Sequence, residues 1–302
     1  MTTNSLFFII GPTRSGSKIY QNALSKIDGV EVFDTLHFLR PKWVGNDFVR
    51  ISKKFGSLAN DENLLKLVEL IYSKKLITSP SGTFWSSNAL DLIKREKLFG
   101  RLKASSRNPK IIFDVLLSEI RKSRNINLLG IRAPVHVKYT DLWRKLYPSS
   151  KILFIIRDPR AIFISTIKKN IKYKLENAGR SARIIMYIKR FFYVIVLFRI
   201  SMQKNKVLIG DDNFKLIRFE DLLDDDVGVF RDICEFMNLQ FNDKILDIPE
   251  ADSSYAKVGS VRSVRGINKE LADKWREHMH PLVNRLFKIL LKKEMKYFGY
   301  LT

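Results

Sequence analysis

The stretch from Leu6 to Lys18 constrains the fold of this chain most, because it joins a short apolar run, a glycine loop and a helical pattern. Residues 6–10 (LFFII) are aromatic or branched and stop at Gly11-Pro12, which predicts a buried strand and a tight loop. From Ser17 onward, apolar residues recur at helical spacing. Such a unit directs backbone N–H groups and the positive end of a helix at one point, which suits a bound phosphate.

This loop differs from the phosphate-binding loop of ATPases and kinases in its last two residues. Gly11 and Gly16 have the spacing of the pattern G-x-x-x-x-G-K-[ST], but Ser17-Lys18 inverts its end. The inversion moves the lysine off the position that reaches the outer phosphates and the hydroxyl off the magnesium position. Arg14 is therefore left as the expected charge partner of an anion. Taken alone, the loop is also compatible with a structural turn.

The rest of the chain alternates short apolar runs with helical patterns. Strands are expected at residues 30–33, 127–132, 151–156 and 214–219, and helices at residues 64–71, 90–102, 139–146 and 184–201. The alternation predicts a single α/β domain over residues 1–302, with a three-layer, P-loop-like parallel sheet and helices on both faces. A helical insertion is expected at about residues 40–125. A C-terminal loop and helix are expected at about 257–302, with the helix beginning near Asn268 and carrying Trp275.

Charge and composition limit the partners and the compartment. The net charge of +23 requires an anionic partner, and nucleic acid, an acidic lipid surface, an acidic polysaccharide or a polyphosphorylated cofactor would each serve. Basic residues are spread along the whole chain, which disfavours nucleic acid. The single cysteine, Cys234, excludes an internal disulfide framework and fits the apolar side of a helix. With no room for a signal peptide before the first strand, a cytoplasmic protein is expected.

The most apolar run of the chain, residues 184–200, does not predict a transmembrane helix. Lys189, Arg190 and Arg199 interrupt it. Packing in the core is the expected role of this helix, and contact with a membrane surface is the alternative.

Polar residues follow two of the expected strands, where ligands of open parallel sheets bind. Asp34 and His37 come after the second strand and are candidates for a general base, with a capped turn as the alternative. Arg157 ends the strand at 151–156, and Ser165 follows about two helical turns later. The two side chains can hold one compact anion from two sides. A solvated helix start is the alternative for this segment.

Together these stretches resemble the sulfotransferases that use 3′-phosphoadenosine 5′-phosphosulfate (PAPS), most of all the carbohydrate- and tyrosyl-type members. The loop is similar to the family's 5′-phosphosulfate loop, which implies that Arg14, Ser15, Gly16, Ser17 and Lys18 bind the 5′ end of the nucleotide. The run from Lys151 to Ser165 resembles the 3′-phosphate motif, with Arg157 and Ser165 in the two binding positions.

Weaker similarities occur in the same order along the chain. Residues 218–223 (RFEDLL) resemble the family's Arg-Tyr-Glu-Asp-Leu segment, and residues 131–136 (IRAPVH) its Lys-Thr-Pro-x-His segment, with Arg132 in place of lysine. Arg262, Arg265 and Gly266, with Trp275 downstream, are similar to the C-terminal cofactor loop. Residues 35–38 (TLHF) are similar to a Glu-x-His-Phe segment in which the glutamate is the base, but Thr35 occupies that position. Asp34, His37 and His136 therefore all stay candidates for the base.

The resemblance implies transfer of a sulfuryl group from PAPS to a hydroxyl or amine, with adenosine 3′,5′-bisphosphate (PAP) released and no metal required. Arg14, Lys18 and Arg132 would act on the transferred group. The expected acceptor is a glycan or a lipid-linked sugar. The high basicity agrees with an anionic glycan, or with association of the protein with the inner face of an acidic membrane. Two alternatives are a P-loop kinase or NTPase, and a non-catalytic basic protein of this fold that binds nucleic acid or membrane.

Overall fold

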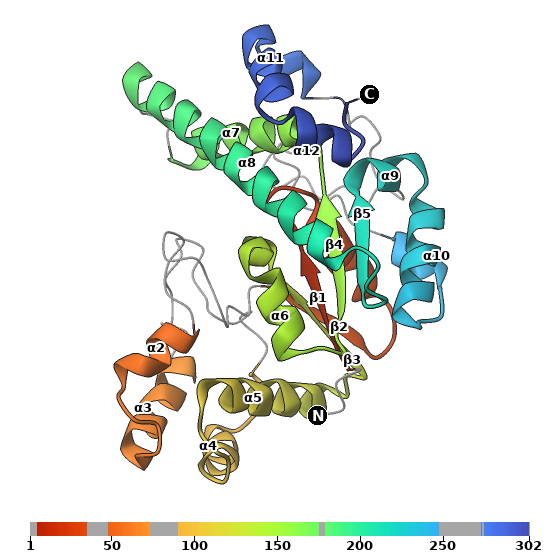
Figure 1. The fold of residues 1–302 in the computed structure, drawn as a ribbon. Helices are drawn as coiled ribbons and strands as arrows, with labels where there is room; N and C mark the ends of the chain where they lie inside the picture. Colours follow the sequence, from red (N-terminus) through yellow and green to blue (C-terminus); the bar gives the residue numbers. More distant parts are fainter. Residues whose placement is uncertain are drawn as a thin grey trace.

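A parallel sheet forms the centre of the molecule in the computed structural model (Figure 1). The structure describes residues 5–34, 48–72, 90–174, 179–247, 273 and 275–301. In this part of the chain five strands pair in the order β2-β3-β1-β4-β5. They are β1 Leu6–Ile10, β2 Val30–Asp34, β3 Leu128–Arg132, β4 Lys151–Ile156 and β5 Phe214–Arg218. All the pairings are parallel, so the carboxyl ends of the strands meet at one edge of the sheet.

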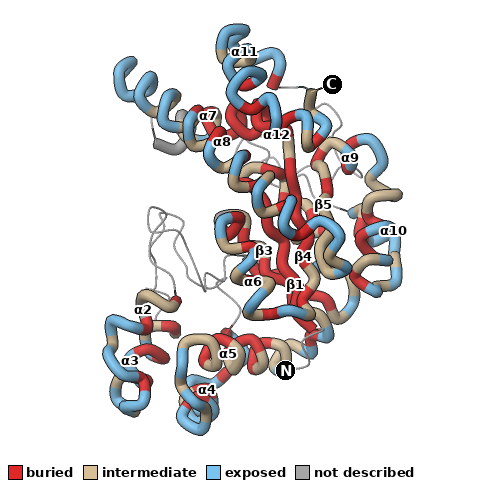
Figure 2. The backbone as a smooth tube through the Cα atoms, in the orientation of Figure 1, coloured by how far each residue is buried: buried red, intermediate tan, exposed pale blue. Residues whose placement is uncertain are grey.

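The central strand β1 supplies side chains to two separate cores. Phe8 and Ile10 point to the core that includes helices α5, α6, α7 and α8, whereas Phe7 and Ile9 point to the core with α1 and α10. Successive side chains of a strand alternate between the faces of its sheet, and every residue of β1 is buried. The molecule therefore has the predicted three layers, and Figure 2 shows the buried strands between exposed helical surfaces.

Most helices lie on one side of the sheet. That side carries α3 Asp61–Tyr72, α4 Arg95–Lys103, α5 Pro109–Arg124, α6 Thr140–Leu146, α7 Pro159–Lys174, α8 Arg180–Leu208, α11 Pro281–Leu290 and α12 Lys292–Tyr297, and α2 Phe48–Lys54 packs beside α5. The other side carries α1 Ser17–Leu24, α9 Phe219–Asp224 and α10 Asp226–Met237. The expected core position of Cys234 on α10 is what the structure shows.

Three expected helices differ from the observed ones. The helix expected at residues 90–102 begins only at Arg95, since residues 90–93 form a turn and a bend before it. Helix α8 runs over 29 residues and crosses in front of the sheet, with its amino-terminal half extending beyond the body (Figure 1). Most side chains between Arg180 and Arg190 are exposed, and burial begins at Phe191, so core packing accounts for only part of this helix. Trp275 lies in a turn before a short 3-10 segment, Arg276–His278, and the terminal helix α11 begins at Pro281. Asn268 lies outside the described residues. Proline favours a first helical position because its missing N–H is not needed there.

No helix in the described part of the chain is long and apolar enough to cross a membrane.

Candidate functional site

The glycine loop lies at the carboxyl edge of the sheet, between β1 and α1. Arg14 and Gly16 adopt left-handed conformations, with φ of 73° and 87°. The Ser15 N–H donates to the Pro12 carbonyl at 3.2 Å and closes the turn, and the Ile19 N–H donates to the Gly16 carbonyl at 2.9 Å as α1 begins. The Ser15 side chain is buried, and its Oγ has no hydrogen-bond partner among the described residues. An orphaned hydroxyl inside a loop of this kind fits a site that accepts an anion.

A direct contact joins this loop to helix α7. The Arg14 Nε–H donates to Ser165 Oγ at 3.0 Å, although the two residues are 151 positions apart. Ser165 is buried on α7, in the turn and helix that follow β4. The residues predicted to bind opposite ends of one nucleotide thus lie in one place.

The side chain of Phe219 joins the loop to Arg157. A Cβ atom at Gly16 would lie 2.3 Å from the Phe219 ring, so the ring packs directly on the glycine. The guanidinium of Arg157 lies over the same ring, with 4.3 Å between its central carbon and the ring centroid. Because β1 and β4 are neighbours in the sheet, Gly16 and Arg157 share the edge where the strand order reverses. Open α/β sheets bind their ligands at this point.

Arg132 holds the start of α1. Its Nε–H donates to Gln21 Oε1 at 2.8 Å, and its Nη1 donates to Ser17 Oγ at 3.1 Å. Gln21 in turn donates to the carbonyl of Val32 at 3.0 Å, so the arginine, the loop end and β2 form one network. Lys18, one residue further along α1, is exposed.

The three candidates for the general base have different positions. Asp34 is the last residue of β2 and lies opposite Arg132 in the strand register. His136 is fully buried in the segment after β3, where its Nδ1 accepts a hydrogen bond from Trp143 Nε1 at 3.0 Å and its ring stacks on the indole at 5.4 Å. His37 lies outside the described residues, as do Arg262, Arg265 and Gly266.

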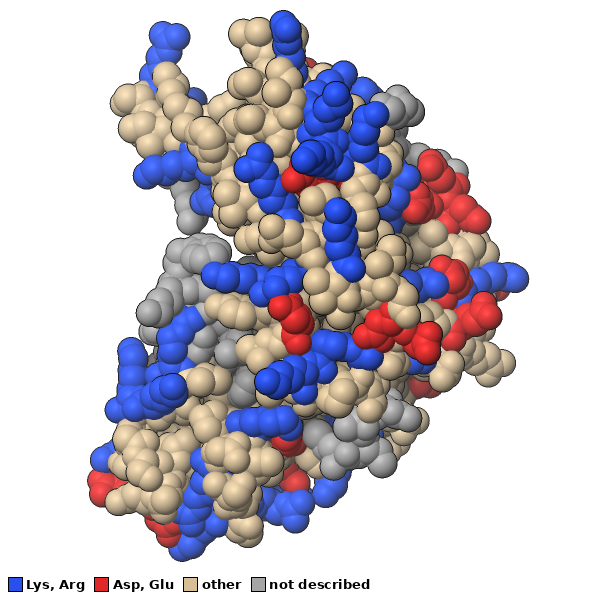
Figure 3. Space-filling view, in the orientation of Figure 1, with Lys and Arg blue, Asp and Glu red and all other residues tan. Residues whose placement is uncertain are grey.

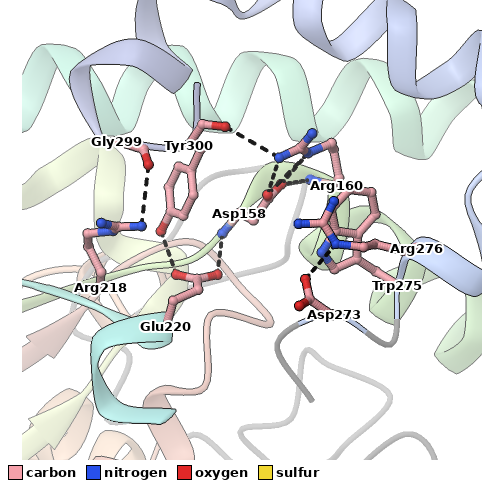
Figure 4. Close-up of a pocket in the computed structure, with 9 residues that line it drawn as sticks. All are labelled: Asp158, Arg160, Arg218, Glu220, Asp273, Trp275, Arg276, Gly299 and Tyr300. Carbon is pink, nitrogen blue, oxygen red and sulfur yellow. Dashed lines mark hydrogen bonds and ion pairs between the residues drawn. The ribbon is translucent and has the colours of Figure 1, made fainter. Parts of the chain in front are cut away.

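A polar pocket lined by Asp158, the residue after Arg157, fixes the turn that carries this arginine (Figure 4). Glu220 accepts hydrogen bonds from the Asp158 N–H at 3.0 Å and from the Tyr300 hydroxyl at 2.8 Å. Asp158 pairs with Arg160 at 2.6 Å, and Arg160 lies 4.4 Å from the centroid of the buried Trp275 ring. These contacts hold the first residues of α7, and with them Arg157, against the C-terminal segment.

Sequence reasoning missed this pocket and one further contact. Arg160, Glu220 and Tyr300 come from three distant segments, and their sequence neighbours give no periodic signal. Thr13 Oγ1 and the Tyr193 hydroxyl of α8 lie 3.2 Å apart, which joins the loop to the long helix. The segment resemblance at residues 218–223 was the one available pointer to Glu220.

Replacement of Glu220 by glutamine is expected to change how stability depends on pH. Burial raises the pKa of the Glu220 carboxyl above its ordinary 4.5. Such a carboxyl binds more protons in the folded than in the unfolded chain, so its contribution to the free energy of unfolding falls as pH rises from about 4.5 through the folded pKa. Glutamine does not titrate, so the wild type should lose up to about 1.4 kcal/mol per pH unit relative to Glu220→Gln in that interval. Urea unfolding at stepped pH measures the free energy of unfolding of both proteins. If the free energy of the wild type rose with pH relative to that of Glu220→Gln, the expectation would be contradicted.

The arrangement is that of a P-loop-like nucleotide-binding protein: a parallel sheet, a glycine loop after β1, and cationic side chains at the switch point of the strand order. The model of the sulfotransferase family matches residues 7–243, well over half of the chain. The chain belongs to the sulfotransferase family, which confirms the predicted family and, with the sheet, the predicted fold class.

Known proteins resemble this chain over most of its length. Rat sulfotransferase 2A6 is 24% identical over 209 residues, which cover 65% of this chain and 70% of the rat protein. The sulfotransferase domain of the Synechococcus PCC 7002 olefin synthase is 18% identical and covers 98% of this chain and 95% of its own, with a TM-score of 0.60. Mouse sulfotransferase SULT7A1, solved in complex with PAP, is 13% identical with a TM-score of 0.50, covering 97% of this chain and 85% of its own.

Among the described residues, no group of three His, Cys, Asp or Glu side chains is placed to hold a metal ion.

Proposed function

We propose that this protein transfers a sulfuryl group from PAPS to a hydroxyl or amine of an acceptor. The observation that carries the proposal is the hydrogen bond from Arg14 to Ser165. It supports one site in which the glycine loop and the β4–α7 turn act on the two ends of one bisphosphorylated nucleotide. The mouse relative solved with PAP has the same fold, which agrees with this nucleotide.

The loop residues fit the 5′ end of PAPS. The buried hydroxyl of Ser15 has no partner among the described residues, and Gly16 packs so closely on Phe219 that a side chain there would have to displace the ring. Backbone N–H groups of residues 14–18, the Arg14 guanidinium and the Lys18 ammonium would surround the phosphosulfate. Ser17, whose Oγ already accepts from Arg132, would be oriented by that arginine.

The 3′ phosphate would be held by Arg157 and Ser165. A guanidinium supplies a planar, permanently charged donor, and the serine supplies a neutral one. Arg262, Arg265 and Gly266 are proposed to close over the same phosphate. In support of this role, Trp275, nine residues after Gly266, packs on Arg160, three residues from Arg157.

The chemistry that PAPS supplies is a sulfuryl group, and its transfer breaks the S–O bond to the 5′-phosphate as the bond to the acceptor atom forms. Arg14 and Lys18 stabilise the negative charge that grows on the leaving phosphate oxygen. A base takes the proton of the acceptor, and Asp34 and His37 are the preferred candidates. His136 is a weaker one because its imidazole is buried against Trp143. Arg132 acts as a positioning residue through Ser17 and Gln21.

For the acceptor we propose a glycan or a lipid-linked sugar, with the protein working in the cytoplasm and meeting the acceptor at the inner face of a membrane. The net charge of +23 supports an anionic acceptor or surface.

Calorimetry separates this function from its rivals. We expect PAP to bind in the presence of EDTA, and ATP to bind more weakly with no gain from magnesium. Adenosine 5′-phosphate, which lacks the 3′ phosphate, should bind at least tenfold more weakly than PAP, since a charged hydrogen bond is worth about 1.5–3 kcal/mol. A strict magnesium requirement with ATP would favour a kinase or NTPase. If DNA bound and PAP did not, the result would favour a non-catalytic protein.

A further inference from the structure

Two helices at one end of the molecule expose apolar stripes. On α8 an exposed apolar residue recurs at every fourth position from Ile184 to Val196. On α11 exposed apolar residues stand at positions 282, 286 and 289, so each set lies on one helical face. We name them, with the basic residues around them, the α8/α11 patch. Its apolar members are Ile184, Ile185, Ile188, Phe192, Val196, Leu282, Leu286 and Ile289, and its basic members are Arg180, Lys189, Arg285 and Lys288.

Contacts beneath the patch join the two helices. The buried ring of Phe191 packs on Phe287 of α11 with 4.8 Å between centroids. Arg199, seven residues after Phe192 and so on the same face of α8, donates to the Leu290 carbonyl of α11 at 3.0 Å. The stripes therefore belong to one supported surface. Phe192 itself is 58% exposed although its neighbour in sequence is buried.

The charge of the patch is of one sign. Helix α8 contains seven lysines and arginines and no aspartate or glutamate, and α11 contains two basic residues and no acidic ones. Lys189, Arg285 and Lys288 form no ion pair in the part of the chain that the structure describes. Figure 3 shows blue side chains around tan surface over α8 and α11, whereas most of the red gathers on the other side, over α9 and α10.

We infer that the α8/α11 patch docks on an anionic lipid bilayer. Aliphatic and aromatic side chains on one helical face, with lysine and arginine beside them, fit the boundary between headgroups and acyl chains. A second copy of this chain fits less well, because pairing two such patches would bring like charges together. A nucleic acid would use the basic residues but would leave the aliphatic stripe exposed to water.

The inference deepens the proposed function, because it names the surface on which the acceptor is met. Tyr193, next to Phe192 on α8, contacts Thr13 of the glycine loop. The loop therefore lies about one helix diameter, roughly 10 Å, from the patch. Docking would place the proposed transfer site beside the bilayer, within reach of a lipid-linked sugar. The test of docking requires no sulfuryl transfer. Docking can therefore fail while the proposed function holds, and the proposed function can fail while docking holds.

Sedimentation with lipid vesicles tests the inference. The full chain should bind vesicles that contain phosphatidylglycerol, bind phosphatidylcholine vesicles weakly, and lose affinity as salt is raised. Phe192→Ser and Leu286→Ser should each weaken binding about tenfold, because each removes one inserted apolar side chain. The matched control is Val207→Ser, which changes a 72% exposed residue eleven positions beyond Val196 on the same helix and should bind as the wild type does.

A charge-reversal pair completes the design. Lys288→Glu should weaken binding at least tenfold, whereas Lys26→Glu, an exposed change after α1 on the other side of the sheet, should have a smaller effect. Unchanged binding by the patch variants would overturn the inference. So would a dimer of the wild type, seen by sedimentation velocity, that Phe192→Ser abolishes, since the patch would then join two copies. Circular dichroism of the same samples shows that each variant is folded, without reliance on nucleotide binding.

Discussion

The variant Arg157→Ala is expected to bind PAP roughly 10- to 150-fold more weakly than the wild type, because it removes a charged donor whose hydrogen bonds to an anion are worth about 1.5–3 kcal/mol. The side chain is well placed for this role. It lies over the Phe219 ring at the carboxyl end of β4, and that ring also packs on the glycine loop. The ring fixes the plane of the guanidinium, so little rotational freedom is lost when a phosphate binds. Calorimetric titration of PAP measures the effect.

The ligand and the variant each have a matched control in this experiment. Adenosine 5′-phosphate should bind wild type and Arg157→Ala with similar affinity, because the arginine is assigned to the 3′ phosphate. Arg157→Lys should give an intermediate loss for PAP, since lysine keeps the charge but not the planar fork. Arg101→Ala, on the distant helix α4, removes an ion pair with Glu119 at 3.3 Å but should leave the affinity for PAP unchanged. An equal loss for both nucleotides would show that Arg157 supports the fold of the site and does not contact the 3′ phosphate.

The sequence was sufficient to predict the strands because each is a short apolar run with a clear end. Strand β1 stops at Gly11-Pro12 and β4 at the Arg157-Asp158-Pro159 turn, and both are buried as predicted. Helix boundaries were less predictable. The signal for α11 was present in His280-Pro281, where the His280 side chain accepts a hydrogen bond from the Leu282 N–H at 3.3 Å. The amphipathic pattern around Trp275 outweighed it, although Trp275 is in fact buried in a turn.

The apolar helix α8 shows where composition misleads. A run as apolar as 184–200 predicts core packing, yet a helix that extends past its sheet buries one face along part of its length. Phe191, Val194 and Phe198 are buried, whereas Ile188 and Phe192 are exposed. Where a helix leaves its support depends on the positions of α7 and α11, which the local pattern does not contain.

The candidate site was predictable to the extent that it follows from strand ends. Loop and turn residues at neighbouring strand ends must approach one another in a parallel sheet, and Arg14 and Ser165 do. The supporting contacts were not predictable, since Glu220 joins Asp158 and Tyr300 across 62 and 80 positions. His136 illustrates the same limit. Its pattern fits a base, and the partner that buries it, Trp143, lies seven residues away in a helix whose orientation the sequence does not fix.

The variant Gly11→Ala is expected to have the largest effect on stability. A Cβ atom at this position would lie 2.0 Å from the backbone oxygen of Ile155 in β4. The φ of Gly11 is +155°, a value that residues with side chains rarely adopt. Because β1 and β4 are paired neighbours at the centre of the sheet, neither backbone can move without breaking ladder hydrogen bonds. We expect a loss of more than about 4 kcal/mol in the free energy of unfolding, or failure to accumulate as soluble protein.

Two other glycines turn this expectation into a graded test that remains informative if Gly11→Ala does not fold. A Cβ atom at Gly16 would lie 2.3 Å from the Phe219 ring, and a side chain can move where a backbone cannot, so Gly16→Ala should fold with a smaller loss and weaker PAP binding. Gly100, in helix α4, has nothing within 4 Å of such an atom. Gly100→Ala should stabilise the protein by about 0.5–1 kcal/mol, because alanine loses less backbone entropy in a helix.

Urea unfolding of the three variants should therefore give the largest loss of unfolding free energy for Gly11→Ala, a smaller loss for Gly16→Ala and a gain for Gly100→Ala. If Gly11→Ala were as stable as Gly100→Ala, the close packing of the loop against β4 would not exist, and the geometry assigned to the phosphosulfate loop would lose its support.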